Sequence, residues 1–216
     1  MKIPHEGGWT FEDKEISMSF DDHVRQQLPW YDLATGVTSH LVRHYLPNNG
    51  VIYDIGASTG NIGKAIRDII ENRRARLIAL EPSKEMAEIY DGGGDLYTDL
   101  VEEHKFIEFD VAVSFLSMMF VRVSERESVI ASLWDKCRAG GAIIIFDKMP
   151  SGSGYLSTAI ARLTLAGKVA TGVPSNEIIA KELSLSGVQR PYVPPQKYNP
   201  VEVFRFGEFA GWVIEK

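Results

Sequence analysis

The sequence predicts a doubly wound α/β fold with a mostly parallel sheet and an antiparallel hairpin at the C-terminus. Between residues 51 and 147, short apolar segments alternate with segments of helical periodicity, which is the pattern of a parallel sheet with crossover helices. Residues 201–215 alternate with a period of two around Gly207, as the strands of a hairpin do. The length of 216 residues, 44% of them hydrophobic, fits a single buried core.

The N-terminal part is expected to form an arm followed by a helical segment. Residues 1–20 show no hydrophobic period and are expected to be a loosely ordered arm. Residues 21–46 carry apolar residues at helical spacing, with Pro29 inside the pattern and Pro47 at its end. Residues 21–216 are expected to form one domain.

Five short strands and the helices between them are expected in the central part. A helix is expected at 61–72, another with Ser83 as its N-cap, and a third from Ser124 to Arg138 that the Ala139-Gly140-Gly141 run ends. With the hairpin, the strands make a seven-stranded sheet. The five strands are expected at 51–56, 76–81, 96–97, 110–115 and 142–147.

The segment at about 150–200 differs from the alternating pattern. Residues 155–171 can form a helix, a second helix can start near Ser175, and residues 188–200 hold four prolines. Long connections of this kind usually build binding sites at the carboxyl edge of a parallel sheet. We expect this insertion to pack over that edge.

Composition and charge limit the classes of partner and the compartment. A formal net charge of −6 provides no general attraction for nucleic acid or an anionic membrane. A single cysteine, Cys137, excludes an internal disulfide framework and fits a reducing compartment. No signal-peptide pattern or membrane-spanning run is found, so a cytoplasmic protein is expected. His40 and His44 have the spacing of zinc ligands, but no third ligand accompanies them, so no metal site is expected.

The first expected strand leads into a turn of small residues, Asp54-Ile55-Gly56-Ala57-Ser58-Thr59-Gly60. Ligands of open parallel sheets lie outside the carboxyl ends of the strands, and the first turn brings the backbone closest to them. The spacing G-x-x-x-G-x-x-G differs from the dinucleotide fingerprint, and no Lys-Ser or Lys-Thr pair follows as in a phosphate loop. The turn is therefore expected to bind a ligand that has no pyrophosphate.

Two further acidic residues indicate a nucleoside. Glu81 follows the second expected strand, and its carboxylate can accept hydrogen bonds from both hydroxyls of a ribose. Asp99 follows the weak third strand, where its carboxylate either reads an adenine edge or caps a helix, and Leu100 can cover a ring face. The turn at 54–60, Glu81 and Asp99 together indicate a bound nucleoside more specifically than any one of them does.

These residues resemble the cofactor motifs of the class I S-adenosylmethionine-dependent methyltransferases. Their D-x-G-x-x-x-G turn matches Asp54, Gly56 and Gly60. Their acidic residue after the second strand matches Glu81, and their adenine-reading aspartate matches Asp99. The resemblance implies a Rossmann-like methyltransferase fold, S-adenosylmethionine as cofactor, S-adenosylhomocysteine as product, and no metal.

Other segments resemble the carboxy-S-adenosylmethionine synthase branch of this family. They are Pro29-Trp30-Tyr31, the run ending Ser114-Phe115-Leu116, Ser124-Glu125-Arg126, A-G-G-A-I-I-I-F-D-K and the final F-x-F-G-E-F. The resemblance implies a homodimer and a set of cofactor contacts. Together with the turn residues, the expected cofactor-binding residues are Tyr31, Asp54, Gly56, Ala57, Ser58, Gly60, Glu81, Pro82, Asp99, Leu100 and Ser114.

One position departs from the synthase pattern. The synthases hold the extra carboxylate of their donor with an arginine in a run resembling E-I-x-Q-K-R, and the matching run here ends in Glu182. A carboxylate repels an anionic group where an arginine attracts it. Arg190 could take over this role. A Pro-rich loop around Pro191 also stands where the synthases have a helix, which would reshape the acceptor pocket.

Three functions follow from these features. The first is methyl transfer to a small-molecule acceptor or to a nucleoside, including one in tRNA. The second is synthesis of the carboxylated donor from prephenate, for modification of a tRNA wobble uridine, and the third is binding of S-adenosylmethionine without turnover, as a sensor or partner subunit. No residue is identified as a catalytic base. Trp30 either covers the cofactor or packs between two helices. A cluster of aromatic residues and methionines at the end of the fourth strand either lines an acceptor pocket or belongs to the core. Its members are Phe115, Met118, Met119 and Phe120.

Overall fold

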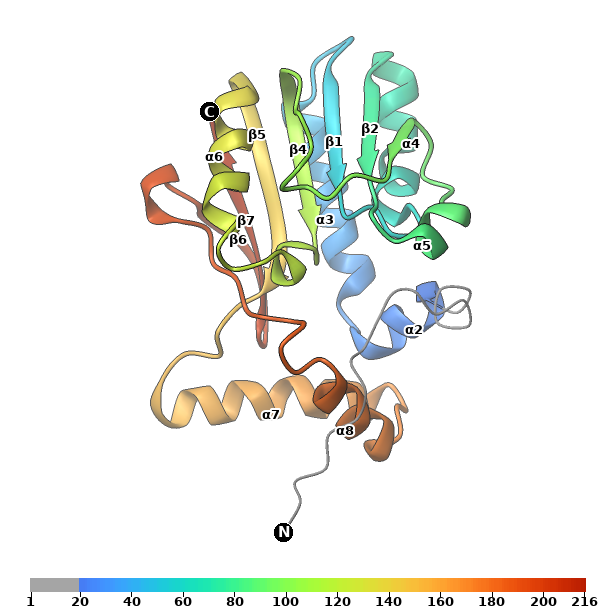
Figure 1. Ribbon diagram of the computed structural model, residues 1–216. Coiled ribbons are helices and arrows are strands. Elements are labelled where there is room, and N and C mark those ends of the chain that lie inside the picture. Colours follow the sequence, from blue (N-terminus) through green and yellow to red (C-terminus); the bar gives the residue numbers. More distant parts are fainter. Residues whose placement is uncertain (1–19) are drawn as a thin grey trace.

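The computed structural model describes residues 20–216 (Figure 1). Of the expected arm at 1–20, residues 1–19 lie outside the described range. A single seven-stranded sheet has the order β3-β2-β1-β4-β5-β7-β6. Its strands are β1 (Val51–Ile55), β2 (Arg76–Leu80), β3 (Asp95–Tyr97), β4 (Phe109–Phe115), β5 (Cys137–Lys148), β6 (Val201–Phe206) and β7 (Phe209–Glu215).

Strands β1 to β5 pair in parallel, whereas β7 runs antiparallel to both β5 and β6. The predicted fold class, a mostly parallel doubly wound sheet with a C-terminal antiparallel hairpin, is confirmed. The chain moves outward from β1 through β2 to β3 and then returns to place β4 on the other side of β1. Such a reversal of strand order separates two strand ends and leaves a crevice for ligands.

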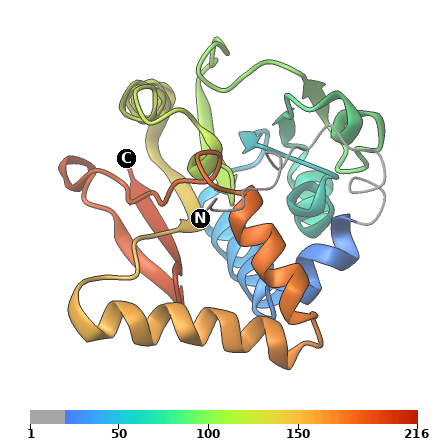
Figure 2. The same ribbon diagram turned by 60° about the horizontal axis from the view of Figure 1, so that its bottom comes forward.

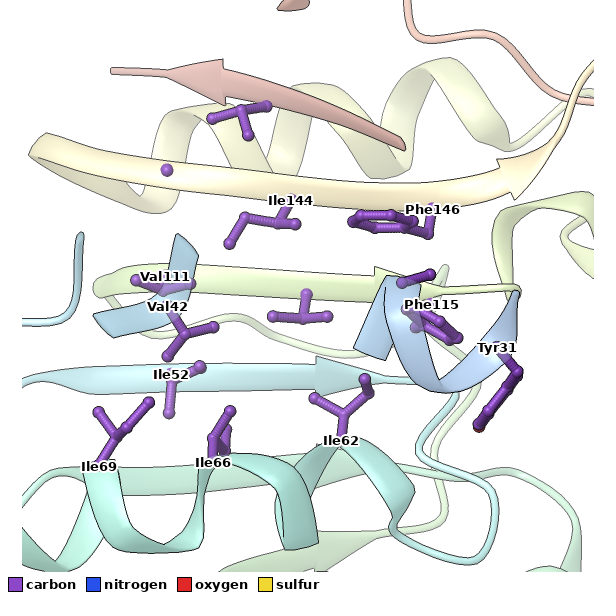
Figure 3. Close-up of a cluster of buried hydrophobic side chains, with 14 of the residues drawn as sticks. Tyr31, Val42, Ile52, Ile62, Ile66, Ile69, Val111, Phe115, Ile144 and Phe146 are labelled. Carbon is purple, nitrogen blue, oxygen red and sulfur yellow. The ribbon is translucent and has the colours of Figure 1, made fainter. Parts of the chain in front are cut away.

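Helices cover both faces of the sheet. Side chains of β1 alternate, so that Ile52 packs with α3 and α4 on one face while Tyr53 packs with α6 on the other. Figure 3 shows the first cluster, in which Ile62, Ile66 and Ile69 of α4 meet Ile52 of β1. The helices are α2 (Phe20–Gln27), α3 (Tyr31–Tyr45), α4 (Asn61–Arg73), α5 (Lys84–Glu88), α6 (Arg126–Lys136), α7 (Gly154–Ala170) and α8 (Ser175–Ser184), with the 3-10 turns η1 (Met118–Phe120) and η2 (Gln196–Tyr198).

Two expected helices have different bounds in the structure. The segment at 21–46 forms two helices, because Pro29 has no N–H to donate within a helix and its ring clashes with the preceding turn. Helix α6 begins at Arg126, so Ser124 is not its N-cap. The Ser83 cap of α5 is confirmed, because its hydroxyl accepts a hydrogen bond from the Met86 N–H at 3.3 Å.

The expected end of α6 at Ala139-Gly140-Gly141 is wrong, because these residues lie in β5, which starts at Cys137. The Gly140 N–H donates to the Lys216 carbonyl, and the Lys216 N–H donates to the Gly141 carbonyl. Pairing with the C-terminal residue thus draws the glycines into the sheet. A contact so distant in sequence leaves no local signal.

Helices α7 and α8 lie beyond the carboxyl ends of β4 and β5 (Figure 1). When this side comes forward, α8 lies across α3, with α2 beside it and α7 along the edge (Figure 2). With this placement, α7 and α8 form a cover over the edge at which ligands of such sheets bind.

Within residues 20–216, no helix is long and apolar enough to span a bilayer.

Candidate cofactor and acceptor site

The turn after β1 is tied to the end of β2 and requires glycine at two positions. The N–H groups of Gly56 and Ala57 both donate to the Leu80 carbonyl, at 2.8 and 2.9 Å. Gly56 has φ +70°, and a Cβ there would lie 2.5 Å from the Ser117 Cβ. Gly60 has φ +90°, and a Cβ would lie 2.3 Å from the Gly92 nitrogen. Neither position has room for a side chain.

Glu81 follows β2 and is held by the backbone. Its two carboxylate oxygens accept hydrogen bonds from the N–H groups of Ser58 and Ser83, at 2.7 and 2.9 Å. Burial raises the pKa of Glu81, and these two N–H donors partly offset the rise. Each carboxylate oxygen keeps a second lone pair, so the group can still accept from hydroxyls. Glu81 is therefore an acceptor of fixed position.

Ser58 adopts a strained backbone conformation in the same turn. Its φ is +51°, in the left-handed region that non-glycine residues seldom occupy. Such a conformation costs roughly 1–3 kcal/mol and is most frequent at functional sites. In this conformation the Ser58 N–H donates to Glu81.

A cavity of about 190 Å³ opens at the ends of β1 and β2, and we call it the strand-end cavity. Five of the predicted cofactor residues line it, namely Gly56, Glu81, Pro82, Asp99 and Leu100. They come from three separate turns that follow β1, β2 and β3. The remaining lining residues are Ile55, Leu80, Ser83, Val101, Glu102, Leu116, Ser117, Phe120 and Val121.

Asp99 and Leu100 present a carboxylate and an apolar surface to this cavity. His104 Nδ1 lies 2.9 Å from Asp99 Oδ2, and the His104 ring packs edge-on against Tyr53. The imidazole therefore fixes the carboxylate from behind. Leu100 is 40% exposed, in keeping with a side chain that can cover a ring. No helix follows Asp99, so the helix-cap alternative does not apply.

Asp54 is buried just before the turn. Its carboxylate oxygens have no hydrogen-bond partner of standard geometry among residues 20–216. Burial, together with the nearby Glu81 charge, raises the pKa of Asp54 to about 7, and the Gly63 N–H offsets the rise only in part. A buried carboxylate whose hydrogen bonding is so incomplete is costly, so this group is open to a cation or a hydrogen-bond donor.

The other predicted cofactor residues lie around the strand-end cavity without lining it. Ala57, Ser58 and Gly60 form the back of the turn, and the Ser114 hydroxyl is 2.6 Å from the hydroxyl of Ser117, which does line the cavity. Tyr31 lines a second cavity and packs edge-on against Phe115.

The second cavity, of about 120 Å³, lies beneath α7 and α8, and we call it the lysine cavity. Leu116 and Phe120 line both cavities and so form the wall between them. Leu116 also has a positive φ of +59°, a second strained position at the site. The lysine cavity is lined by His23, Val24, Gln27, Leu28, Tyr31, Phe115, Leu116, Met119, Phe120, Lys148, Thr164, Lys168, Lys181, Glu182, Leu185, Gln189 and Phe209.

Glu182 faces this cavity but does not make it negative. Lys168 Nζ lies 2.6 Å from Glu182 Oε1, and Lys148 Nζ lies 3.8 Å from Oε2. Burial alone would raise the pKa of Glu182, but the lysines hold it below its ordinary value. The repulsion that the sequence suggested at this position is thus offset by two lysines.

Sequence reasoning missed these lysines. Lys148 ends β5, Lys168 lies on α7 and Lys181 lies on α8, where its Nζ is 2.7 Å from His23 Nε2. No spacing in the sequence relates the three. Only the packing of α7 and α8 over the sheet brings them together.

The structure separates the roles of several apolar residues. Phe115, Met119 and Phe120 line the lysine cavity, whereas Met118 is fully buried in the cluster on the other face. Trp30 packs against Phe204 and Phe209 and belongs to the core rather than to either cavity.

Arg126 holds the Pro-rich loop beside the site. Its guanidinium donates to the carbonyls of Val121, Pro191, Met119 and Arg190, at 2.9 to 3.0 Å. Arg190 itself lies outside both cavity linings.

Comparisons with known proteins agree with this geometry. No family model matches the sequence. The chain is 25% identical to the carboxy-S-adenosyl-L-methionine synthase of Staphylococcus epidermidis over 94% of its own length and 91% of the relative's. Proteins of the same name match from Campylobacter lari (25% identity, 100% and 97% coverage) and Shewanella pealeana (26%, 96% and 89%).

Solved structures with this fold include several methyltransferases. An S-adenosyl-L-methionine-dependent methyltransferase from Methanococcus maripaludis aligns with a TM-score of 0.58 at 14% identity, covering 99% of this chain and 97% of that one. Human N-acetylserotonin methyltransferase, solved with S-adenosylmethionine, aligns with a TM-score of 0.59 at 9% identity, covering 95% of this chain and 57% of that one. The plantazolicin methyltransferase, solved with S-adenosylhomocysteine, aligns with a TM-score of 0.54 at 13% identity, covering 94% of this chain and 90% of that one.

By sequence, therefore, the chain is a homologue of the carboxy-S-adenosyl-L-methionine synthases, and its fold is that of the S-adenosylmethionine-dependent methyltransferases.

Proposed function

We propose that this chain is a methyltransferase that binds S-adenosylmethionine in the strand-end cavity and transfers its methyl group to a small molecule in the lysine cavity. The observation that carries the proposal is the shared wall of the two cavities. Leu116 and Phe120 line both, at the point where the strand order reverses between β1 and β4. A donor and an acceptor on either side of this wall would be within reach of each other.

The cofactor would be held by groups that the fold already fixes. Glu81 would accept the two ribose hydroxyls with the lone pairs that Ser58 and Ser83 leave open. Asp99 and Leu100 would bind the adenine edge and face. The buried Asp54 carboxylate would provide a counter-charge for the ammonium group at the amino-acid end.

Methyl transfer from a sulfonium needs few catalytic groups. The acceptor's lone pair forms the new bond while the S–CH₃ electron pair returns to sulfur, leaving S-adenosylhomocysteine. The main requirement is an acceptor held close and in line, with water excluded. The phenyl rings of Phe115 and Phe120 lie where they would serve this purpose. No metal is needed for this chemistry, and none is proposed.

A small molecule suits the acceptor cavity better than a nucleoside within tRNA. The cavity holds about 120 Å³ and is lined by residues of α7 and α8. A nucleotide in a folded RNA would have to displace this cover. We therefore place the nucleoside acceptor second.

Two measurements test the proposal. Isothermal titration with S-adenosylmethionine and S-adenosylhomocysteine should show binding of both, and absence of binding would rule out all functions that use this cofactor. Release of S-adenosylhomocysteine should then require a protein-free, small-molecule extract. Release with purified tRNA instead would favour the nucleoside acceptor, and binding without any release would favour a sensor or partner subunit.

Carboxylated donor synthesis is the second candidate, favoured by the full-length similarity to the synthases. Lys148 and Lys168 remove the electrostatic objection that Glu182 raised. Mass spectrometry of the co-purifying ligand distinguishes the plain from the carboxylated donor. Consumption of prephenate with S-adenosylmethionine would support the synthase, and a Glu182→Arg variant should then bind the carboxylated donor more tightly.

A cytoplasmic location and a homodimer complete the proposal. The location is supported by the single cysteine, and the dimer by the resemblance to the synthases. Size-exclusion chromatography with light scattering measures the oligomeric state directly.

A further inference from the structure

We infer that His104 is a positioning residue of the cofactor site, which holds the Asp99 carboxylate in place for the 6-amino group of an adenine. The inference rests on the proposed function, because it takes the strand-end cavity to be the cofactor site. His104 is not among the residues that line this cavity, so it would act only through Asp99, which does line it.

The His104 ring contacts the Asp99 carboxylate directly. Its Nδ1 lies 2.9 Å from Asp99 Oδ2. An ionised carboxylate can only accept hydrogen bonds, so the imidazole N–H is the donor. Asp99 Oδ1 is not engaged by the imidazole and can accept from a ligand in the strand-end cavity.

The two side chains differ in their exposure to solvent. The Asp99 side chain is 51% exposed, whereas the His104 side chain is only 8% exposed. Immobilising a side chain at the moment of binding costs about 0.5–1.5 kcal/mol. A buried donor that already fixes the carboxylate reduces this cost before the ligand arrives, so His104 would preorganise the site.

Aromatic rings fix the imidazole in turn. The His104 ring packs edge-on against the rings of Tyr53, Tyr97 and Phe106, with centroid distances of 5.6, 5.5 and 5.1 Å. Tyr53 is itself anchored by its hydroxyl, which accepts from the Ile107 N–H at 3.1 Å. Because Tyr53 lies in β1 and Tyr97 in β3, the sheet holds the imidazole together with its own loop.

The backbone around His104 also supports Leu100. The N–H groups of Glu103 and His104 both donate to the Leu100 carbonyl, at 3.0 Å. This turn brings the ring of His104 back to Asp99 and fixes the backbone that carries Leu100. The carboxylate for the adenine edge and the side chain for the adenine face thus share one support.

A fixed carboxylate discriminates between purines by the group at position 6. The amino group of adenine donates to it, whereas the carbonyl of hypoxanthine is an acceptor and leaves two acceptors facing each other. A carboxylate that is free to turn would reach the N1–H of hypoxanthine instead. A site built around one hydrogen bond rejects a ligand that cannot make it, so selectivity for a 6-aminopurine measures how firmly Asp99 is held.

Isothermal titration with S-adenosylhomocysteine and S-inosylhomocysteine tests the inference. The two probes differ only in the purine edge, at position 6 and N1. We expect the wild-type protein to bind the adenosyl probe at least about tenfold more tightly, which is a difference of about 1.4 kcal/mol. Equal affinities would overturn the inference and leave the proposed function standing. Failure of both probes to bind would contradict the proposed function, and the inference with it.

Two variants separate the hydrogen bond from the ring packing. His104→Phe keeps a ring among the aromatic side chains but removes the donor, and it should lose the preference, chiefly through weaker binding of the adenosyl probe. His104→Asn places an amide N–H at the position of Nδ1 and should retain the preference. His40→Phe makes the same change as His104→Phe at an exposed position of α3 that lines neither cavity, and it should alter neither affinity.

An equal loss of affinity for both probes in His104→Phe, with the preference kept, would show a merely structural role and overturn the inference. Thermal unfolding reports whether each variant is folded. If His104→Phe is not, His104→Gln carries the same expectation, because its amide lies at the position of Nε2 rather than Nδ1.

Combined substitutions show whether His104 acts through Asp99. Asp99→Asn should remove the preference, and adding His104→Phe to it should change neither affinity further, because residues that act as one unit have non-additive effects. Additive losses in the double variant would overturn the inference.

Discussion

At the level of single residues, the buried carboxylate of Asp54 destabilises the unliganded protein at neutral pH. Its pKa is about 7 in the folded state against an ordinary value of 3.8. Between these two values the folded state binds more protons than the unfolded state. The free energy of unfolding therefore falls as pH rises from about 4 to about 7, and it remains at this lower value above pH 7. Asp147, whose pKa burial also raises to about 7, acts in the same direction.

The Asp54→Asn variant should remove Asp54's share of this pH dependence. At pH 8 we expect the unliganded variant to be more stable than the wild type by roughly 2–4 kcal/mol, since each pKa unit corresponds to about 1.4 kcal/mol. Near pH 3, below both pKa values, Asp54 is largely neutral in both states, so the two should be nearly equal. Urea unfolding at both pH values measures this, and an advantage that does not change with pH would contradict the explanation. Cofactor binding should weaken in the same variant.

Glu81 is the residue whose loss should most directly affect the cofactor. In Glu81→Gln, an amide replaces one of the oxygens that accept from the N–H groups of Ser58 and Ser83. Hydrogen bonds to charged groups contribute about 1.5–3 kcal/mol, so the Kd for S-adenosylhomocysteine should rise roughly 10- to 100-fold. Glu71→Gln, at an exposed position of α4, makes the same chemical change away from both cavities and should leave the Kd unaltered. Isothermal titration compares the two, and equal affinities would exclude Glu81 from the cofactor site.

The convergence of the candidate cofactor residues could be predicted and that of the lysines could not, for one physical reason. Gly56, Glu81 and Asp99 each follow a strand, and the carboxyl ends of parallel strands share one edge of the sheet. Their convergence therefore follows from the strand pattern alone. Lys148, Lys168 and Lys181 meet only because α7 and α8 pack in one particular way, and no periodicity encodes that packing.

At the level of secondary structure elements, the start of α4 depends on the glycine at its N-cap. Gly60 combines φ +90° with a contact of 2.3 Å to the Gly92 nitrogen for any added Cβ. Gly172 has nearly the same φ, +89°, but nothing within 4 Å of its Cβ position. Comparing alanine substitutions at Gly60 and Gly172 therefore distinguishes the cost of backbone strain from the cost of a steric clash.

Gly172→Ala should cost roughly 1–2 kcal/mol, the price of a left-handed conformation for an L-residue. Gly60→Ala should cost more than Gly172→Ala, because the backbone around Gly92 must also move, and it should weaken cofactor binding. Thermal unfolding and isothermal titration measure both effects. Equal destabilisation by the two substitutions would show that the close approach of Gly92 is not needed.

The elements of the sheet were predictable where the local pattern decided them. The alternation of strands and helices at 51–147 and the hairpin around Gly207 both fold as the sequence indicated. The start of β5 differs because the pairing of Gly140 and Gly141 with Lys216 is a long-range contact. The start of α6 differs as well: the Ser124 hydroxyl donates to the Glu125 carboxylate and caps no helix.

For the molecule as a unit, a bound cofactor should raise the melting temperature. A ligand at 100 times its Kd stabilises the folded state by about 2.7 kcal/mol, and a domain of this size gains about 2–4 °C per kcal/mol. S-adenosylhomocysteine should therefore raise Tm by roughly 5–10 °C at that concentration. NAD, which carries a pyrophosphate that the turn at Gly56 has no place for, should leave Tm unchanged at the same concentration. An equal shift with NAD would indicate a dinucleotide site instead.

The wall formed by Leu116 and Phe120 has a consequence for how the two ligands affect each other. Any movement of these side chains on filling the strand-end cavity also reshapes the lysine cavity. Thermodynamic linkage makes such an influence reciprocal. The factor by which S-adenosylhomocysteine changes the affinity for a ligand of the lysine cavity must equal the factor by which that ligand changes the affinity for S-adenosylhomocysteine. Titrations in the two orders of addition should thus give one coupling free energy, and its sign states whether the wall makes the two occupants cooperate or compete.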